Sequence, residues 1–171
     1  MVTGIISIRI FTAPSACFGD IVFVMDESGS IGTTNFDLMK DFLSRLVSRL
    51  DIDSGNTRVG LVTFSTNVRI TINLNAHSTV RSFQSAIQSI NYPGGNTNTA
   101  AALEYVRTRM LTSAAGDRSN IPNVVVVLTD GSSGQPDDTR VSGVSYKIRY
   151  MLVLLHYHVL IDKPEEHMHS A

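Results

Sequence analysis

The chain has 171 residues, of which 43% are hydrophobic, and a formal net charge of -1. A chain of this size can bury one core of ordinary size, so we expect a single globular domain. The sequence has no basic stripe that would neutralise phosphates, and we therefore expect no nucleic-acid partner. Cys17 is the only cysteine, so the chain as given cannot form an internal disulfide.

The first predicted element is a buried strand that ends at an acid. Residues 21–25 form an apolar run without polar alternation, which is typical of a strand covered on both faces. Asp26 follows directly, and a buried carboxylate is costly unless a positive group meets it. Ser28 and Ser30 add hydroxyl oxygens in the next turn. Oxygen ligands of this kind favour Mg²⁺, Mn²⁺ or Ca²⁺ over zinc or copper.

Two other acids near this strand are given structural roles. Glu27 lies between the candidate ligands, and the alternation of a strand directs it away from Asp26, so we interpret it as a solvated side chain. Asp20 precedes the apolar run and is interpreted as a backbone-pairing residue rather than as a further ligand.

The middle of the chain alternates helices and strands, which is the pattern of a mostly parallel α/β sheet. Thr34 and Asp37 have the spacing of a capping box, at the start of a helix that runs to about Leu50. The further predicted elements are a buried strand over 58–64, an edge strand over 68–74, a helix over about 80–90 and a helix over about 99–110. We interpret their apolar stripes as core.

Two later segments complete a candidate metal site. The turn-forming loop 93–99 offers the hydroxyl of Thr97, and a second buried strand, which begins at residue 123, ends at Asp130. Each residue alone also fits a structural role, because serines and glycines form turns and an aspartate at a strand end often caps a helix. Together, five candidate ligands on three loops favour one divalent metal ion: Asp26, Ser28, Ser30, Thr97 and Asp130.

These segments resemble the von Willebrand factor type A domain, also called the integrin I domain. The family pattern is Asp-x-Ser-x-Ser, a loop threonine and a strand-terminal aspartate, and the five candidate ligands match it in order. The resemblance covers about residues 20–138. It implies a doubly wound, mostly parallel α/β sheet with helices on both faces, a Rossmann-like fold that we expect to be incomplete at the C-terminus. It also implies a metal-ion-dependent adhesion site (MIDAS) at the switch point of the sheet.

The resemblance further implies a protein-binding module. In the family, the ion keeps an open position that an Asp or Glu carboxylate of a partner fills, and we expect Mg²⁺ or Mn²⁺ rather than Ca²⁺. The sequence Gly-Gly-Asn-Thr-Asn-Thr over residues 94–99 favours the extracellular branch of the family, which includes the A domains of collagen type VI and matrilins. The expected ligand is then collagen or another matrix protein. The alternative is an intracellular assembly module that works beside an ATPase.

Catalysis is a third class of function, and the sequence argues against it. A Mg²⁺-dependent phosphotransferase with Asp26 as nucleophile needs a second acid two residues later, where Ser28 stands. A serine hydrolase of the α/β type needs a Gly-x-Ser-x-Gly elbow, which neither Ser28 nor Ser30 occupies. We therefore expect no enzyme.

The flanking segments depart from the family pattern. Residues 1–19 are interpreted as a leader or a fragment edge, since Arg9 interrupts the apolar stretch of a weak signal peptide. Residues 139–171 are an atypical C-terminal segment, which indicates a fragment, a splice variant or an imperfect gene model. Its apolar run over 149–161 is short for a membrane span. Either this run supplies a fifth strand beside the strand of Asp130, or that strand is left as a bare hydrophobic edge that favours aggregation.

The atypical segment carries two further expectations. Without the usual helices beside it, we expect the chain to be less stable than a complete family domain, with the weakness after Asp138. Two histidine pairs lie in this segment, and we interpret them as unligated rather than as zinc or copper ligands: His156, His158, His167 and His169.

Overall fold

The computed structural model describes residues 19–130 and 148–155 of the chain. Cys17, the four histidines of the C-terminal segment and residues 156–161 of the apolar run over 149–161 lie outside the described residues.

One five-stranded sheet forms the centre of the described structure. Its strands are β1 (Gly19–Asp26), β2 (Thr57–Phe64), β3 (Val68–Ile72), β4 (Asn123–Thr129) and β5 (Ile148–Leu155). The spatial order is β3-β2-β1-β4-β5, and every neighbouring pair is parallel except β2 and β3. The central first strand and the edge strand confirm the topology expected from the sequence, and of the two alternatives for the run over 149–161 the structure shows the fifth strand beside β4.

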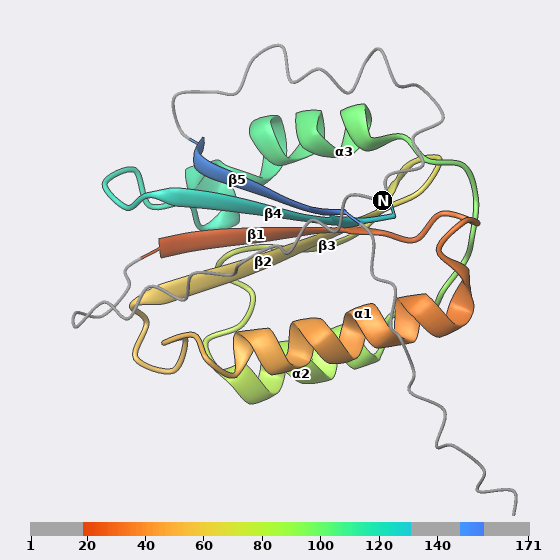
Figure 1. Ribbon diagram of the computed structural model, residues 1–171. Coiled ribbons are helices and arrows are strands. Elements are labelled where there is room, and N and C mark those ends of the chain that lie inside the picture. Colours follow the sequence, from red (N-terminus) through yellow and green to blue (C-terminus); the bar gives the residue numbers. More distant parts are fainter. Residues whose placement is uncertain (1–18, 131–147, 156–171) are drawn as a thin grey trace, which may run out of the picture.

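Helices cover both faces of this sheet. Helices α1 (Gly32–Val47) and α2 (Val80–Gln88) lie on one face, and α3 (Thr99–Tyr105) lies on the other (Figure 1). A π-helical segment, η1 (Val106–Met110), continues α3, and a short 3-10 helix, η2 (Ser113–Ala115), follows. Among the described residues, no helix has the length and apolar character needed to cross a membrane.

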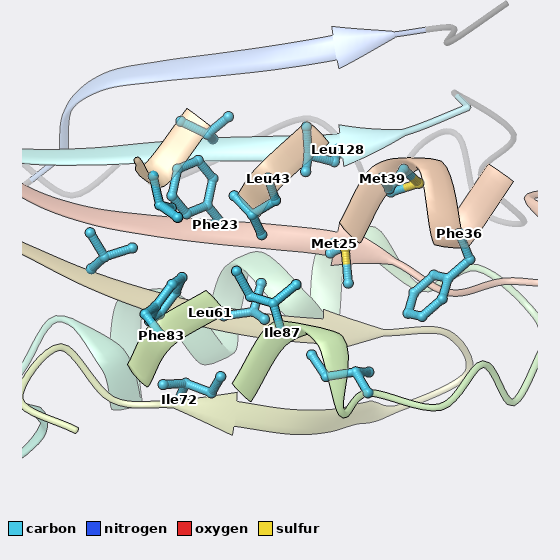
Figure 2. Packing of buried hydrophobic residues seen from close by; sticks show 14 of the residues in the cluster. Phe23, Met25, Phe36, Met39, Leu43, Leu61, Ile72, Phe83, Ile87 and Leu128 are labelled. Atoms are coloured by element: carbon cyan, nitrogen blue, oxygen red, sulfur yellow. The ribbon is translucent and has the colours of Figure 1, made fainter. Parts of the chain in front are cut away.

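The alternation of side chains along β1 divides the core into two layers. Phe23 and Met25 face α1 and α2, where they pack with Leu43 and Phe83 (Figure 2). On the opposite face, fully buried residues of β1 and β2 pack with Ala102 of α3 and Val106 of η1: Val22, Val24, Val62 and Phe64. Because both faces of β1 are covered, the strand has the continuous apolar run seen in its sequence.

The predicted capping box at Thr34 and Asp37 is wrong. Helix α1 begins at Gly32, with Ile31 at the N-cap position and no side-chain cap, so Thr34 already lies inside the helix. Asp37 forms an ion pair with Lys40 at 2.9 Å instead of closing a cap. The start of α1 is set by a turn in which the Ile31 amide donates to the Ser28 carbonyl at 3.2 Å.

Candidate metal site

Asp26 lies at the end of β1, and its side chain is fully buried. Its Oδ1 accepts a hydrogen bond from the Ser28 amide and its Oδ2 accepts one from the Thr129 hydroxyl, each at 2.8 Å. Burial raises the pKa of Asp26; the bonds from Ser28 and Thr129 oppose this shift, and the negative charge of Asp130 adds to it. A cation bound between the two carboxylates would remove this cost, because it favours their charged forms.

Ser28 and Ser30 form the next part of the site. Their hydroxyl oxygens lie 3.2 Å apart in the turn that follows β1. Ser28 is fully buried, whereas Ser30 is exposed. The turn therefore presents a pair of neutral oxygens that begins beside the Asp26 carboxylate and extends to the surface.

Thr97 lies in a loop that is fixed beside this turn. The Gly29 amide donates to the Gly95 carbonyl at 2.7 Å, which joins the loop to the turn of Ser28 and Ser30. The Asn98 amide donates to the Ser65 carbonyl at 2.9 Å, so the loop is also joined to the end of β2. Thr97 stands between these two attachments and is half-buried.

Asp130 follows the last residue of β4, the neighbour of β1. Met25 pairs with Leu128 in the parallel register, so Thr129 comes level with Asp26 and Asp130 lies just beyond. The effect of the Asp130 charge on the pKa of Asp26 agrees with this position. All five predicted ligands are thus carried by segments at one end of the sheet.

Glu27 is not a solvated side chain, so this prediction is wrong. It is fully buried, and it accepts two hydrogen bonds from Arg69, from Nε at 2.7 Å and from Nη2 at 2.8 Å. The direction away from Asp26 does not lead to solvent, because β3 places Arg69 there. The only signal of this ion pair in the sequence was that Arg69 lies in a predicted edge strand, which could bring it near Glu27.

Asp20 pairs through its backbone with β2 and β4, as predicted. Its carboxylate is also fully buried and binds the guanidinium of Arg118, with Nη2 to Oδ1 at 2.7 Å. Asp20 begins β1 and Asp26 ends it, so this pair lies at the end of the sheet opposite the candidate site.

Thr129 and Tyr92 are two supporting residues that the sequence did not single out. Thr129 holds Asp26 through its hydroxyl, and its position beside Asp26 follows only from the strand register. The hydroxyl of Tyr92 donates to the Ser28 carbonyl at 2.7 Å and accepts from the Gly32 amide at 3.1 Å. No local motif indicates the second contact, because 60 residues separate its partners.

The donor set fits a hard divalent cation. Across residues 19–130 and 148–155, no cluster of three or more His, Cys, Asp or Glu residues is placed to hold a metal. The candidate site instead offers two carboxylates and three hydroxyls, Asp26 and Asp130 with Ser28, Ser30 and Thr97. Mg²⁺ and Mn²⁺ accept such oxygen ligands and retain water or substrate at other positions.

This chain is similar to known extracellular matrix and adhesion proteins. The mouse collagen alpha-4(VI) chain is 40% identical over 116 residues, covering 67% of this chain and 5% of the collagen. Bovine integrin alpha-2 is 40% identical over 123 residues, covering 71% of this chain and 10% of the integrin. A structure of mussel byssus proximal thread matrix protein 1 with a zinc-occupied MIDAS motif has a TM-score of 0.63 and 30% identity, covering 68% of this chain and 32% of that one.

The described chain therefore spans a small part of the length of these relatives. The family model of the von Willebrand factor type A domain matches residues 20–156. The match continues past residue 138 and includes β5; the division of the chain at residues 19 and 138 stays a prediction. The sheet order, the helices on both faces and the matched range agree, and the chain belongs to the von Willebrand factor type A domain family.

Proposed function

We propose that this domain binds a protein partner through a divalent metal ion, as part of an extracellular adhesion or matrix protein. The observation that carries the proposal is the buried Asp26 carboxylate at the end of β1, with two hydroxyls in the next turn and Asp130 at the end of the neighbouring strand. A negative group buried in this way favours a bound cation.

The ion-holding residues in this proposal are Asp26, Ser28, Ser30, Thr97 and Asp130. A bound divalent ion supplies positive charge for an incoming carboxylate. Ser30 is exposed at the surface end of the site, so an Asp or Glu side chain of a partner has a route to it. Similarity to a collagen chain and to an integrin supports an extracellular setting, with collagen or another matrix protein as the partner.

Binding, rather than catalysis, is the function that this residue set supports. The Ser28 amide and the Thr129 hydroxyl both donate to Asp26, so its carboxylate is held as a hydrogen-bond acceptor near the charge of Asp130. Two such carboxylates suit a bound cation. Matrix and adhesion proteins among the relatives agree with a binding role.

Calorimetric titration tests the metal part of this proposal. We expect the chain to bind Mg²⁺ and Mn²⁺ more tightly than Ca²⁺, because five compact ligands and one partner position suit an octahedron. Asp130→Asn should weaken Mg²⁺ binding by at least about tenfold, since it removes a ligand charge from a partly buried site. Asp51→Asn on the exposed loop after α1 is the matched control and should leave the affinity unchanged. Tight Ca²⁺ binding without Mg²⁺ binding would contradict the preference.

The partner part of the proposal is tested on surfaces coated with fibrillar collagen. Retention of the chain should require Mg²⁺, should be lost in a chelator and should be lost in Asp130→Asn while Asp51→Asn is retained. Metal binding without metal-dependent retention on collagen would leave the metal site in place and refute collagen as the partner.

A further inference from the structure

The ion pair of Glu27 and Arg69 lies directly behind the candidate site. Glu27 stands in sequence between Asp26 and Ser28, and its backbone amide donates to the Phe64 carbonyl at 2.8 Å. Its side chain is 0% exposed, and that of Arg69 is 35% exposed. The two parallel hydrogen bonds, Nε to Oε1 and Nη2 to Oε2, fix the carboxylate in orientation as well as in position.

Arg69 also reaches a second segment of the site. Its Nη2 donates to the Asn91 carbonyl, in the stretch that leads from α2 into the loop of Thr97. One guanidinium on the edge strand β3 therefore contacts both the turn that carries Ser28 and the approach to Thr97. Arg69 is not one of the candidate ligands, but its guanidinium bonds to both of these segments.

A buried ion pair alone does not establish a role at the site. Such pairs contribute little net stability, because desolvation offsets their attraction. The chain contains a second pair of the same kind, Asp20 with Arg118, whose side chains are 0% and 20% exposed. Asp20 and Asp26 are six residues apart on β1, roughly 20 Å at the rise of a strand, so the second pair is remote from the site.

We propose that Arg69 is a positioning residue for the metal site. Resting on the proposed function, the inference is that Arg69 holds Glu27, and through it the turn of Ser28, at the correct distance from the loop of Thr97. The side chain does not itself contact the ion. Residues that orient ligands in this way typically change metal affinity by about tenfold to a hundredfold when they are replaced.

The sign of the effect separates positioning from simple charge. Arg69→Gln removes a positive charge near a cation site and leaves the Glu27 carboxylate unpaired, so electrostatics alone would strengthen Mg²⁺ binding. A positioning role predicts the opposite, a loss of about tenfold or more. Arg69→Lys keeps the charge and loses the two-pronged geometry, and positioning predicts weaker binding here too.

The experiment compares Arg69→Lys and Arg69→Gln with Arg118→Lys and Arg118→Gln. Mg²⁺ affinity is measured by calorimetry on the full chain, and urea unfolding without metal reports the structural cost of each change. We expect all four variants to lose stability and only the Arg69 variants to lose Mg²⁺ affinity. If Arg69→Gln does not fold, Arg69→Lys is judged by the same criterion.

Three results would overturn the inference. Arg69 variants that bind Mg²⁺ as tightly as the wild type, or more tightly, show that the pair is only structural or only electrostatic. Arg118 variants that lose Mg²⁺ affinity to the same degree show that any loss of stability weakens Mg²⁺ binding. A wild-type chain that binds no divalent ion refutes the proposed function itself, and the inference with it.

Discussion

The side chain of Tyr92 holds the turn after β1 in place, although Tyr92 is not a candidate ligand. The hydroxyl of Tyr92 joins the Ser28 carbonyl to the Gly32 amide, so one phenol connects the turn after β1 to the first turn of α1. The ring of Tyr92 packs against Phe36 at a centroid distance of 5.3 Å. Tyr92 and Arg69 thus contact the segments of the candidate ligands although neither belongs to the ligand set.

Gly95 has a backbone conformation that favours glycine, and its carbonyl joins the loop of Thr97 to the turn after β1. Its φ is +124°, and a Cβ there would lie 3.1 Å from the Ser65 Oγ and 3.2 Å from the Thr66 Oγ1. We expect Gly95→Ala to lower the free energy of unfolding by about 1–3 kcal/mol. It should also weaken Mg²⁺ binding, because the added methyl group crowds Ser65 and Thr66, and hydrogen bonds join these two residues to the loop that carries Thr97. Urea unfolding and calorimetric titration measure the two effects separately.

Gly55→Ala is the matched control for Gly95→Ala. Gly55 has a φ of +79°, and a Cβ there would meet no atom within 4 Å. The substitution carries the same kind of backbone strain without the clash, in the loop after α1. It should lower stability and leave the Mg²⁺ affinity unchanged. Equal loss of Mg²⁺ affinity in both variants would show that the Gly95 loop has no particular link to the site.

The elements of the fold followed from the sequence where the signal was local. The apolar run of β1, the helical spacing of α1 and the strand before Asp130 were predicted correctly in type and approximate position. The N-terminus of α1 and the environment of Glu27 were predicted wrongly, because both depend on contacts made across the fold. The five candidate ligands could be predicted because their order along the chain is itself a pattern, and their role stays a prediction. Arg69 and Tyr92, which contact the segments that carry them, belong to no such pattern.

The N-terminus of helix α2 is stabilised by a local side-chain contact, in contrast to the N-terminus of α1. Thr79 is its N-cap, and the Thr79 hydroxyl accepts a hydrogen bond from the Ser82 amide at 3.2 Å. Thr79→Ala should lower the free energy of unfolding by about 1 kcal/mol, the usual cost of losing a cap. The neighbouring exposed residue Ser78 serves as control, and Ser78→Ala should change stability by less than half as much. Urea unfolding at constant Mg²⁺ measures both; equal values would show that the cap adds nothing here.

At the scale of the whole molecule, the candidate site is a product of folding. Its residues come from the end of β1, the loop between α2 and α3, and the end of β4. The parallel pairing of β1 with β4 brings two of these segments together, and the bond from Gly29 to Gly95 brings the third. An unfolded chain does not keep the three segments adjacent, so an ion held by all of them binds the folded state alone.

Metal binding and global stability should therefore be linked. At a free Mg²⁺ concentration one hundred times its dissociation constant, we expect the free energy of unfolding to rise by about 2.7 kcal/mol. Leu43→Ala provides the companion variant, since Leu43 is fully buried between α1 and the sheet and its loss should cost about 2–5 kcal/mol. Leu43 lies 11 residues after Gly32, about 16 Å along α1 from the turn of the site, so Mg²⁺ should stabilise the variant by the same increment. Urea unfolding with Mg²⁺ and with chelator measures both increments, and an increment near zero in the wild type would mean that the ion does not require the folded arrangement of β1, β4 and the Thr97 loop.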